Sequence, residues 1–144
     1  MKQLSRQQII AQEMPEIEAE HRGLFALCWQ FYKELRTGAA SQGQLLDVFN
    51  EIVDQASVHF AHEDVVLKKI VYPRHAMHQL AHRQILIDLV SSQHAMKKVN
   101  EMAHRDAQHS LDALLIHHVR EDAKFARLVG EIEPCSIGIR LWRG

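Results

Sequence analysis

The sequence predicts an all-α, up-down-up-down antiparallel four-helix bundle with a short N-terminal arm and a C-terminal tail. Three observations favour this fold. The 144 residues include only 6 glycines and 3 prolines, so long segments lack residues that break helices. Apolar residues in these segments recur every three or four positions, which is the period of a helix and not of a strand. The connections between the segments are short, as they are between neighbouring antiparallel helices.

Local signals set the expected order and ends of the helices. The first helix is expected to stop at Thr37-Gly38, and the second to start after Ser41, a residue that suits an N-cap. Pro73 ends the second helix and suits the first turn of the third. The expected helical segments are therefore about 17–36, 41–71, 73–97 and 103–129.

The chain is expected to form a single domain over 1–144. The bundle takes up about 15–130, and the remaining tail, 131–144, is too short for another element. Its apolar residues, among them Ile137 and Trp142, predict that the tail packs on a face of the bundle or on a second subunit.

Composition argues against several classes of protein. Lysine plus arginine total 17 and aspartate plus glutamate total 18, so there is no excess of positive charge for nucleic acid or a membrane surface. No apolar run reaches the roughly 18–20 residues of a membrane span, and no secretory signal is visible. Cys28 and Cys135 lie far apart, which favours neither a disulfide framework nor a thiolate metal site. We therefore expect a cytoplasmic protein.

Histidine is unusually frequent, with 11 residues, and it is the commonest metal ligand among side chains. Two pairs at helical spacing, His59 with Glu63 and His78 with His82, each place both side chains on one helix face. With this many histidines a single such pair is expected by chance. A set drawn from all four helices is more informative, because bundles build metal sites in their interior.

The order of the motifs is more specific than any one pair. Four motifs follow one another: E-x-x-H ending at His21, H-F-x-x-E from His59 to Glu63, Y-P-x-x-x-x-H-x-x-x-H from Tyr72 to His82, and H-x-x-x-x-D from His117 to Asp122. In these motifs the chain resembles the hemerythrin family, specifically the bacterial hemerythrins, over about residues 15 to 128. All seven ligand positions of that family are filled in order.

The resemblance implies a carboxylate-bridged, non-haem di-iron centre that binds dioxygen reversibly, in an oxygen carrier, store or delivery protein and not in an enzyme. It implies two Fe2+/Fe3+ ions per chain with an oxo or hydroxo bridge. The ligands follow by position: His78, His82 and His117 on one iron, His21 and His59 on the other, and Glu63 and Asp122 bridging both. The second iron has one protein ligand fewer and keeps an open position for dioxygen.

Leu24, Phe60 and Leu114 match positions of the family's apolar oxygen pocket. His118 stands where the family usually has a branched aliphatic residue, Ala113 replaces a usual tryptophan and Ile85 replaces a usual phenylalanine. Together these differences predict a larger and wetter pocket. An imidazole in that pocket suits the alternative function, a di-iron enzyme or sensor that reacts with peroxide, oxygen or nitric oxide and uses His118 as proton donor. A third interpretation turns His118 to the helix surface.

Helix geometry leaves a further question about the fourth segment. His117 and Asp122 are five residues apart, about 140° around a regular helix, whereas His118 and Asp122 are four apart and share a face. We follow the family pattern and expect His117 to be the ligand, with His118 as its competitor. Dioxygen is the expected partner, while an oxygen-consuming enzyme or a signalling partner is not specified by the sequence. A carboxylate-rich, ferritin-like oxidase site fits less well, because the candidate ligands are mostly histidines.

Overall fold

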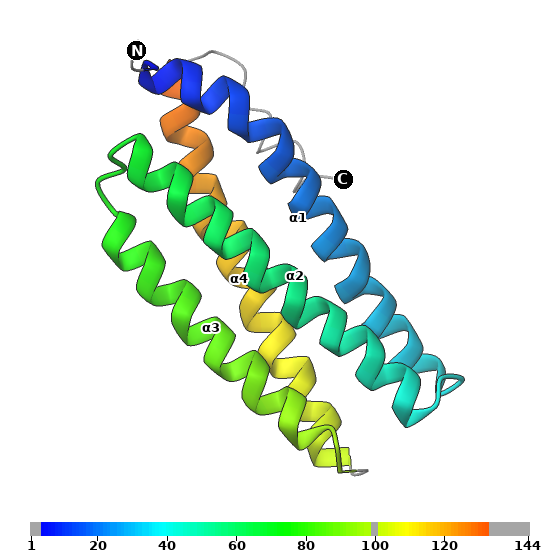
Figure 1. The fold of residues 1–144 in the computed structure, drawn as a ribbon. Coiled ribbons are helices and arrows are strands. Elements are labelled where there is room, and N and C mark those ends of the chain that lie inside the picture. Colours follow the sequence, from blue (N-terminus) through cyan, green and yellow to red (C-terminus); the bar gives the residue numbers. More distant parts are fainter. Residues whose placement is uncertain (1–3, 99–100, 133–144) are drawn as a thin grey trace.

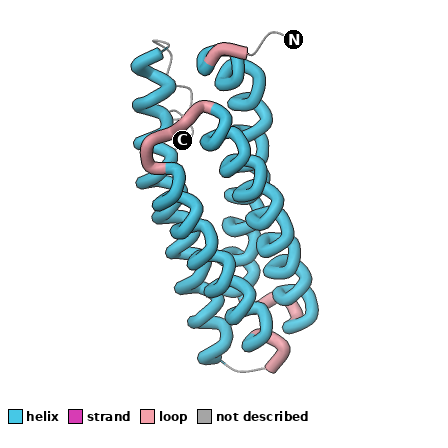
Figure 2. The backbone as a smooth tube through the Cα atoms, turned by 60° about the vertical axis from the view of Figure 1, so that its left-hand side comes forward, coloured by secondary structure: helices cyan, strands magenta, loops and turns pink. Residues whose placement is uncertain are grey.

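The computed structural model describes residues 4–98 and 101–132, with the side chains in these ranges except those of 101 and 121–132. Four helices make up the fold: α1 (Arg6–Thr37), α2 (Gln42–Lys69), α3 (His75–Ala95) and α4 (Glu101–Ile132). Consecutive helices run in opposite directions (Figure 1), which confirms the predicted antiparallel bundle. Seen from a second direction, the helices lie side by side along their length and the connections gather at the two ends (Figure 2).

The helices pack in a closed ring, in which α1 contacts α2, α2 contacts α3, α3 contacts α4, and α4 returns to α1. All four contribute to one apolar core. Phe31 of α1 and Phe49 of α2 meet edge to face with ring centroids 5.5 Å apart, and Leu89 and Leu111 add the contributions of α3 and α4. Each fully buried side chain of this size stabilises the fold by about 1.5–3 kcal/mol. The bundle therefore has a firm apolar core on which to build an interior polar site.

Side-chain caps define the start of two helices. Ser41 caps α2 and forms a capping box with Gln44, in which each side chain bonds the other residue's backbone N–H. Ser5 and Gln8 form the same arrangement at the start of α1. Gly38 follows α1 with a φ of 66°, the left-handed conformation that glycine adopts most easily. The predicted N-cap at Ser41 and the predicted stop at Gly38 are both confirmed.

The start of the first helix was predicted too late. An arm was expected before about residue 17, but α1 begins at Arg6 and runs through Pro15. An internal proline costs about 3 kcal/mol, since it removes a hydrogen bond and crowds the preceding turn. The early turns of α1 offset this cost by burying Ile10 against Leu67, Ile70 and Tyr72. Tertiary packing therefore outweighs the local preference.

The third helix also begins later than predicted. Pro73 lies in the turn between α2 and α3, and the helix starts at His75. The turn is held by backbone bonds in which Val71 donates to Lys68 and Tyr72 donates to Leu67. Val71 takes a φ of 55° there, which is uncommon for a β-branched residue. The tight turn occupies the residues that were assigned to the first turn of the helix.

Most of the predicted tail at 131–144 lies outside the described residues, and only its first two residues are seen, as the end of α4. The expected packing of Ile137 and Trp142 falls outside them too. Within the described ranges, none of the helices combines the length and apolar character needed to cross a membrane.

Candidate metal centre

Among the side chains that the structure describes, six histidines and one glutamate meet in the interior of the bundle. They come from all four helices, and every one is buried. The residues are His21 from α1, His59 and Glu63 from α2, His78 and His82 from α3, and His117 and His118 from α4. The predicted convergence of side chains from four helices is therefore observed for all the described candidates. Asp122 lies in α4, but its side chain is outside the described part of the structure.

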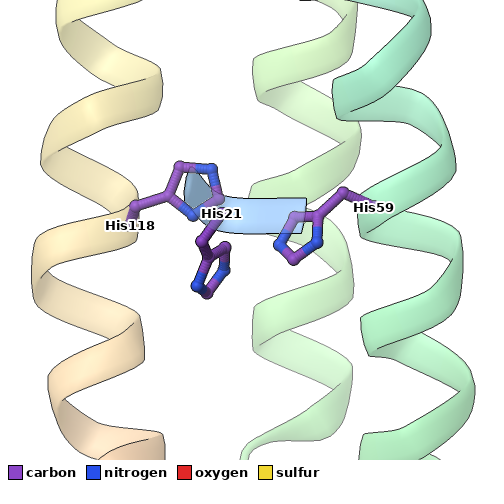
Figure 3. Close-up of side chains that lie close together, drawn as sticks. All are labelled: His21, His59 and His118. Carbon is purple, nitrogen blue, oxygen red and sulfur yellow. The ribbon is translucent and has the colours of Figure 1, made fainter. Parts of the chain in front are cut away.

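Three of the imidazoles form one group, composed of His21, His59 and His118. One ring nitrogen from each lies within 4.8 Å of the other two. The ring centroids of His21 and His59 are 4.3 Å apart, and that of His118 is 4.9 Å from His21. Figure 3 shows these three side chains reaching toward one another across the interior from different helices. This group can hold a metal ion.

The other three imidazoles, His78, His82 and His117, form a second group of the same kind. One ring nitrogen from each again lies within 4.8 Å of the other two. Their ring centroids are 4.2 Å apart for His78 and His82 and about 5 Å apart for the pairs that include His117. The interior thus contains two candidate metal positions, each built from three imidazoles.

Glu63 lies between the two groups and contacts both. Its Oε2 atom is 3.1 Å from Nε2 of His59 and 3.5 Å from Nε2 of His21. Its Oε1 atom bonds His78 and is 3.4 Å from Nε2 of His82. One carboxylate oxygen therefore faces each group. This is the position from which a single carboxylate bridges two metal ions.

The electrostatics of the interior suit this role. Burial alone would raise the pKa of Glu63, but the four imidazoles that face it outweigh burial and hold the pKa well below its usual value. Burial lowers the pKa of His118 well below the ordinary histidine value and also lowers that of His21. The site therefore offers an ionised carboxylate at Glu63 and neutral imidazoles at His21 and His118, the protonation states in which these groups bind metals.

Two further carboxylates orient the imidazoles from outside. Nδ1 of His59 donates to Glu20 at 2.9 Å, and Nδ1 of His82 donates to Asp64 at 3.0 Å. In both cases the other ring nitrogen, Nε2, is directed at Glu63. Carboxylates that fix a ligand histidine in this way are typical of metal sites. Sequence analysis did not identify Glu20 or Asp64, although each is adjacent to a predicted ligand.

His82 shows the effect of this outer partner. Burial lowers its pKa, but hydrogen bonds to Asp64 and Glu63 act in the opposite direction and raise the pKa above the usual histidine value. Asp64 and His82 also line a groove of about 660 Å³ between α2 and α3. This side of the site thus borders a surface opening.

The predicted pocket residues Leu24, Phe60 and Leu114 are all buried. Phe60 lies among the imidazoles: its ring stacks on His82 with centroids 3.9 Å apart and planes 8° apart, and it is 5.7 Å from His118. The prediction that Ala113 enlarges the interior is wrong, because Ala113 is exposed and lines a surface depression instead.

The structure answers two questions about α4. His118 is only 1% exposed, so the interpretation that turned it to the helix surface is wrong. His117 and His118 also do not compete for one place, because His117 joins His78 and His82 while His118 joins His21 and His59. Successive helical residues point about 100° apart, which lets neighbours in sequence serve different groups.

Comparison with known proteins provides no family assignment: no family model, no curated protein and no solved structure matches this chain. The function therefore has to be argued from the residues of the site. What the geometry establishes is a buried cluster of histidines and a glutamate that can hold metal ions.

Proposed function

We propose that this chain is a non-haem di-iron protein whose centre binds dioxygen reversibly, as in an oxygen carrier, store or delivery protein. The position of Glu63 carries the proposal, since each of its two oxygens faces a separate group of three imidazoles. Burying six imidazoles and a carboxylate in an apolar bundle is costly unless the groups are compensated. Two metal ions bound to these groups would provide that compensation.

The donor set supports iron. Imidazole is a good ligand for iron, and a carboxylate adds a hard, negatively charged oxygen. His78, His82 and His117 would hold one ion, and His21 and His59 the other, with Glu63 between them. From the resemblance we add Asp122 as a second bridge. Two bound iron ions would supply the electrons that dioxygen needs and could take them back, because iron is stable as Fe2+ and Fe3+.

The chain itself contributes position and exclusion of water. Glu20 and Asp64 hold His59 and His82 in the tautomer that directs Nε2 inward. Phe60 forms an apolar wall against the imidazoles, and Leu24 and Leu114 belong to the same core. Such surroundings limit the access of water and protons to whatever binds at the centre.

A second function is favoured by one observation, the burial of His118 among His21 and His59. An additional imidazole next to the reactive position is what a di-iron enzyme or sensor for peroxide, oxygen or nitric oxide would use. In that case His118, whose pKa is lowered by burial, would donate a hydrogen bond from its ring N–H to the bound molecule.

Loading with ferrous iron under anaerobic conditions tests both functions. Metal analysis is expected to give about two irons per chain. Exposure to oxygen should produce a visible absorption that disappears when oxygen is removed, as a reversible carrier requires. Irreversible oxidation with release of hydrogen peroxide would support the enzyme or sensor instead. Fewer than two irons after loading would contradict both.

A further inference from the structure

His118 occupies the same place beside His21 and His59 as His117 occupies beside His78 and His82. It is as deeply buried as His59, and its ring centroid lies 4.9 Å from that of His21 and 5.4 Å from that of His59. The corresponding distances from His117 to its two neighbours are 5.1 and 5.0 Å. The two groups therefore match in composition and spacing, and His118 is more deeply buried than His117, with 1% against 9% of its surface exposed.

The spacing is compatible with coordination of one metal ion by all three imidazoles. Nitrogens bound to one ion through bonds of about 2.1 Å stand roughly 3.0 to 4.2 Å apart, depending on the angle between the bonds. The ring nitrogens of His21, His59 and His118 lie within 4.8 Å of one another. This limit exceeds the upper end of the range for a common ion by only about 0.6 Å.

We propose that His118 is the third imidazole ligand of the metal ion held by His21 and His59. The assignment rests on the proposed dinuclear centre and changes its chemistry. With Asp122 as the second bridge and the oxo or hydroxo group that the resemblance implies, each metal would then have three imidazoles, two carboxylate oxygens and the bridging oxygen, so the second metal would no longer have fewer protein ligands than the first. A small molecule that binds there has to compete with His118.

This assignment has a consequence for ligands of the centre. The resemblance implied an open position on the second metal, which dioxygen would occupy without displacing a side chain. With His118 bound, azide or dioxygen enters only when this imidazole leaves. We therefore expect weak anion binding in the wild-type protein and tighter binding once the imidazole is removed.

His118→Leu tests the assignment, with His109→Leu as the matched control, because His109 is exposed on the same helix. Metal-free and anaerobic protein is titrated with Co2+ and with Fe2+, and the imidazoles per metal are counted by X-ray absorption spectroscopy. Loss of an outer partner already costs about 10–100-fold in metal affinity, so loss of a direct ligand should weaken one of the two equivalents by at least about 100-fold. The count should fall by one imidazole per two metals, and azide should bind more tightly. The His109→Leu protein should behave as the wild type.

A second variant shows whether His118 binds the metal directly or only supports the surrounding structure. In His118→Ala the lost affinity should return on addition of free imidazole, which enters the vacated space as a ligand, whereas a purely structural role gives no such rescue. Circular dichroism of the metal-free variants establishes that both are folded. If the wild type binds two metals and His118→Leu binds both with unchanged affinity and imidazole count, the assignment of His118 is wrong. If the wild type itself fails to bind two metals, the proposed function fails with it.

Discussion

Glu63 offers the sharpest test of how the polar interior is held together. In the metal-free protein its carboxylate faces four imidazoles and is itself only 2% exposed. Glu63→Gln keeps the size and one acceptor oxygen but removes the charge. Breaking a buried pair by removing one partner costs about 3–5 kcal/mol. Because the amide oxygen still accepts one hydrogen bond, we expect a loss near the lower end, about 3 kcal/mol.

The stability lost in Glu63→Gln should depend on pH. The pKa of Glu63 is lowered below 4.5, so its contribution to stability is present above that pH and is lost as the pH falls further. The pKa of His82 is raised above 6.5, so its contribution is complete below that pH and is lost as the pH rises through the folded value. The difference between wild type and Glu63→Gln should therefore be largest between about pH 4.5 and 6.5.

Urea denaturation in the presence of a chelator, followed by circular dichroism at several pH values, measures this difference. Glu51→Gln is the matched control, since Glu51 is exposed on the same helix, and it should change stability by less than about 0.5 kcal/mol. Equal urea midpoints for wild type and Glu63→Gln at pH 5.5 would refute the reasoning. A difference that grows steadily above pH 8 would also contradict it.

Three other predictions follow from single contacts. Asp64→Ala should weaken metal binding by about 10–100-fold, measured by Co2+ titration, because His82 loses the partner that orients it. Val71→Gly should raise the free energy of unfolding by about 1 kcal/mol, because glycine adopts the positive φ of this position without strain and the exposed valine side chain loses little packing. A melting temperature below that of the wild type would contradict this prediction. In a Cys135→Ser background, Cys28 should react with Ellman's reagent only on unfolding, because burial raises its pKa to about 12.

The sequence predicted the helices well where their ends depend on local chemistry. Ser41 and Gly38 act through side-chain capping and a left-handed φ, and both effects depend only on neighbouring residues. The start of α1 depends instead on Ile10, which packs against residues about 60 positions away in sequence. No local rule reports such a contact, and for this reason the start of α1 was predicted too late.

In the candidate site, too, features set by nearby residues could be predicted, and features set by packing between helices could not. His59 with Glu63 and His78 with His82 were recognisable because a spacing of four residues places both members on one face. The direction of His118 depends on how α4 is rotated about its axis when it packs against three other helices, and that rotation is a property of the whole bundle. Glu20 was overlooked because a glutamate on an amphipathic helix ordinarily faces water.

The candidate ligands of this centre come from all four helices, so metal binding would be linked to how firmly the helices hold together. Metal ions bound at the two oxygens of Glu63 would act as cross-links, and the helices could not separate without releasing them. A ligand present at 100 times its dissociation constant adds about 2.7 kcal/mol of stability, a large fraction of the reserve of a domain this size. The supply of metal in the cell would then govern how long the folded chain survives as well as whether it works.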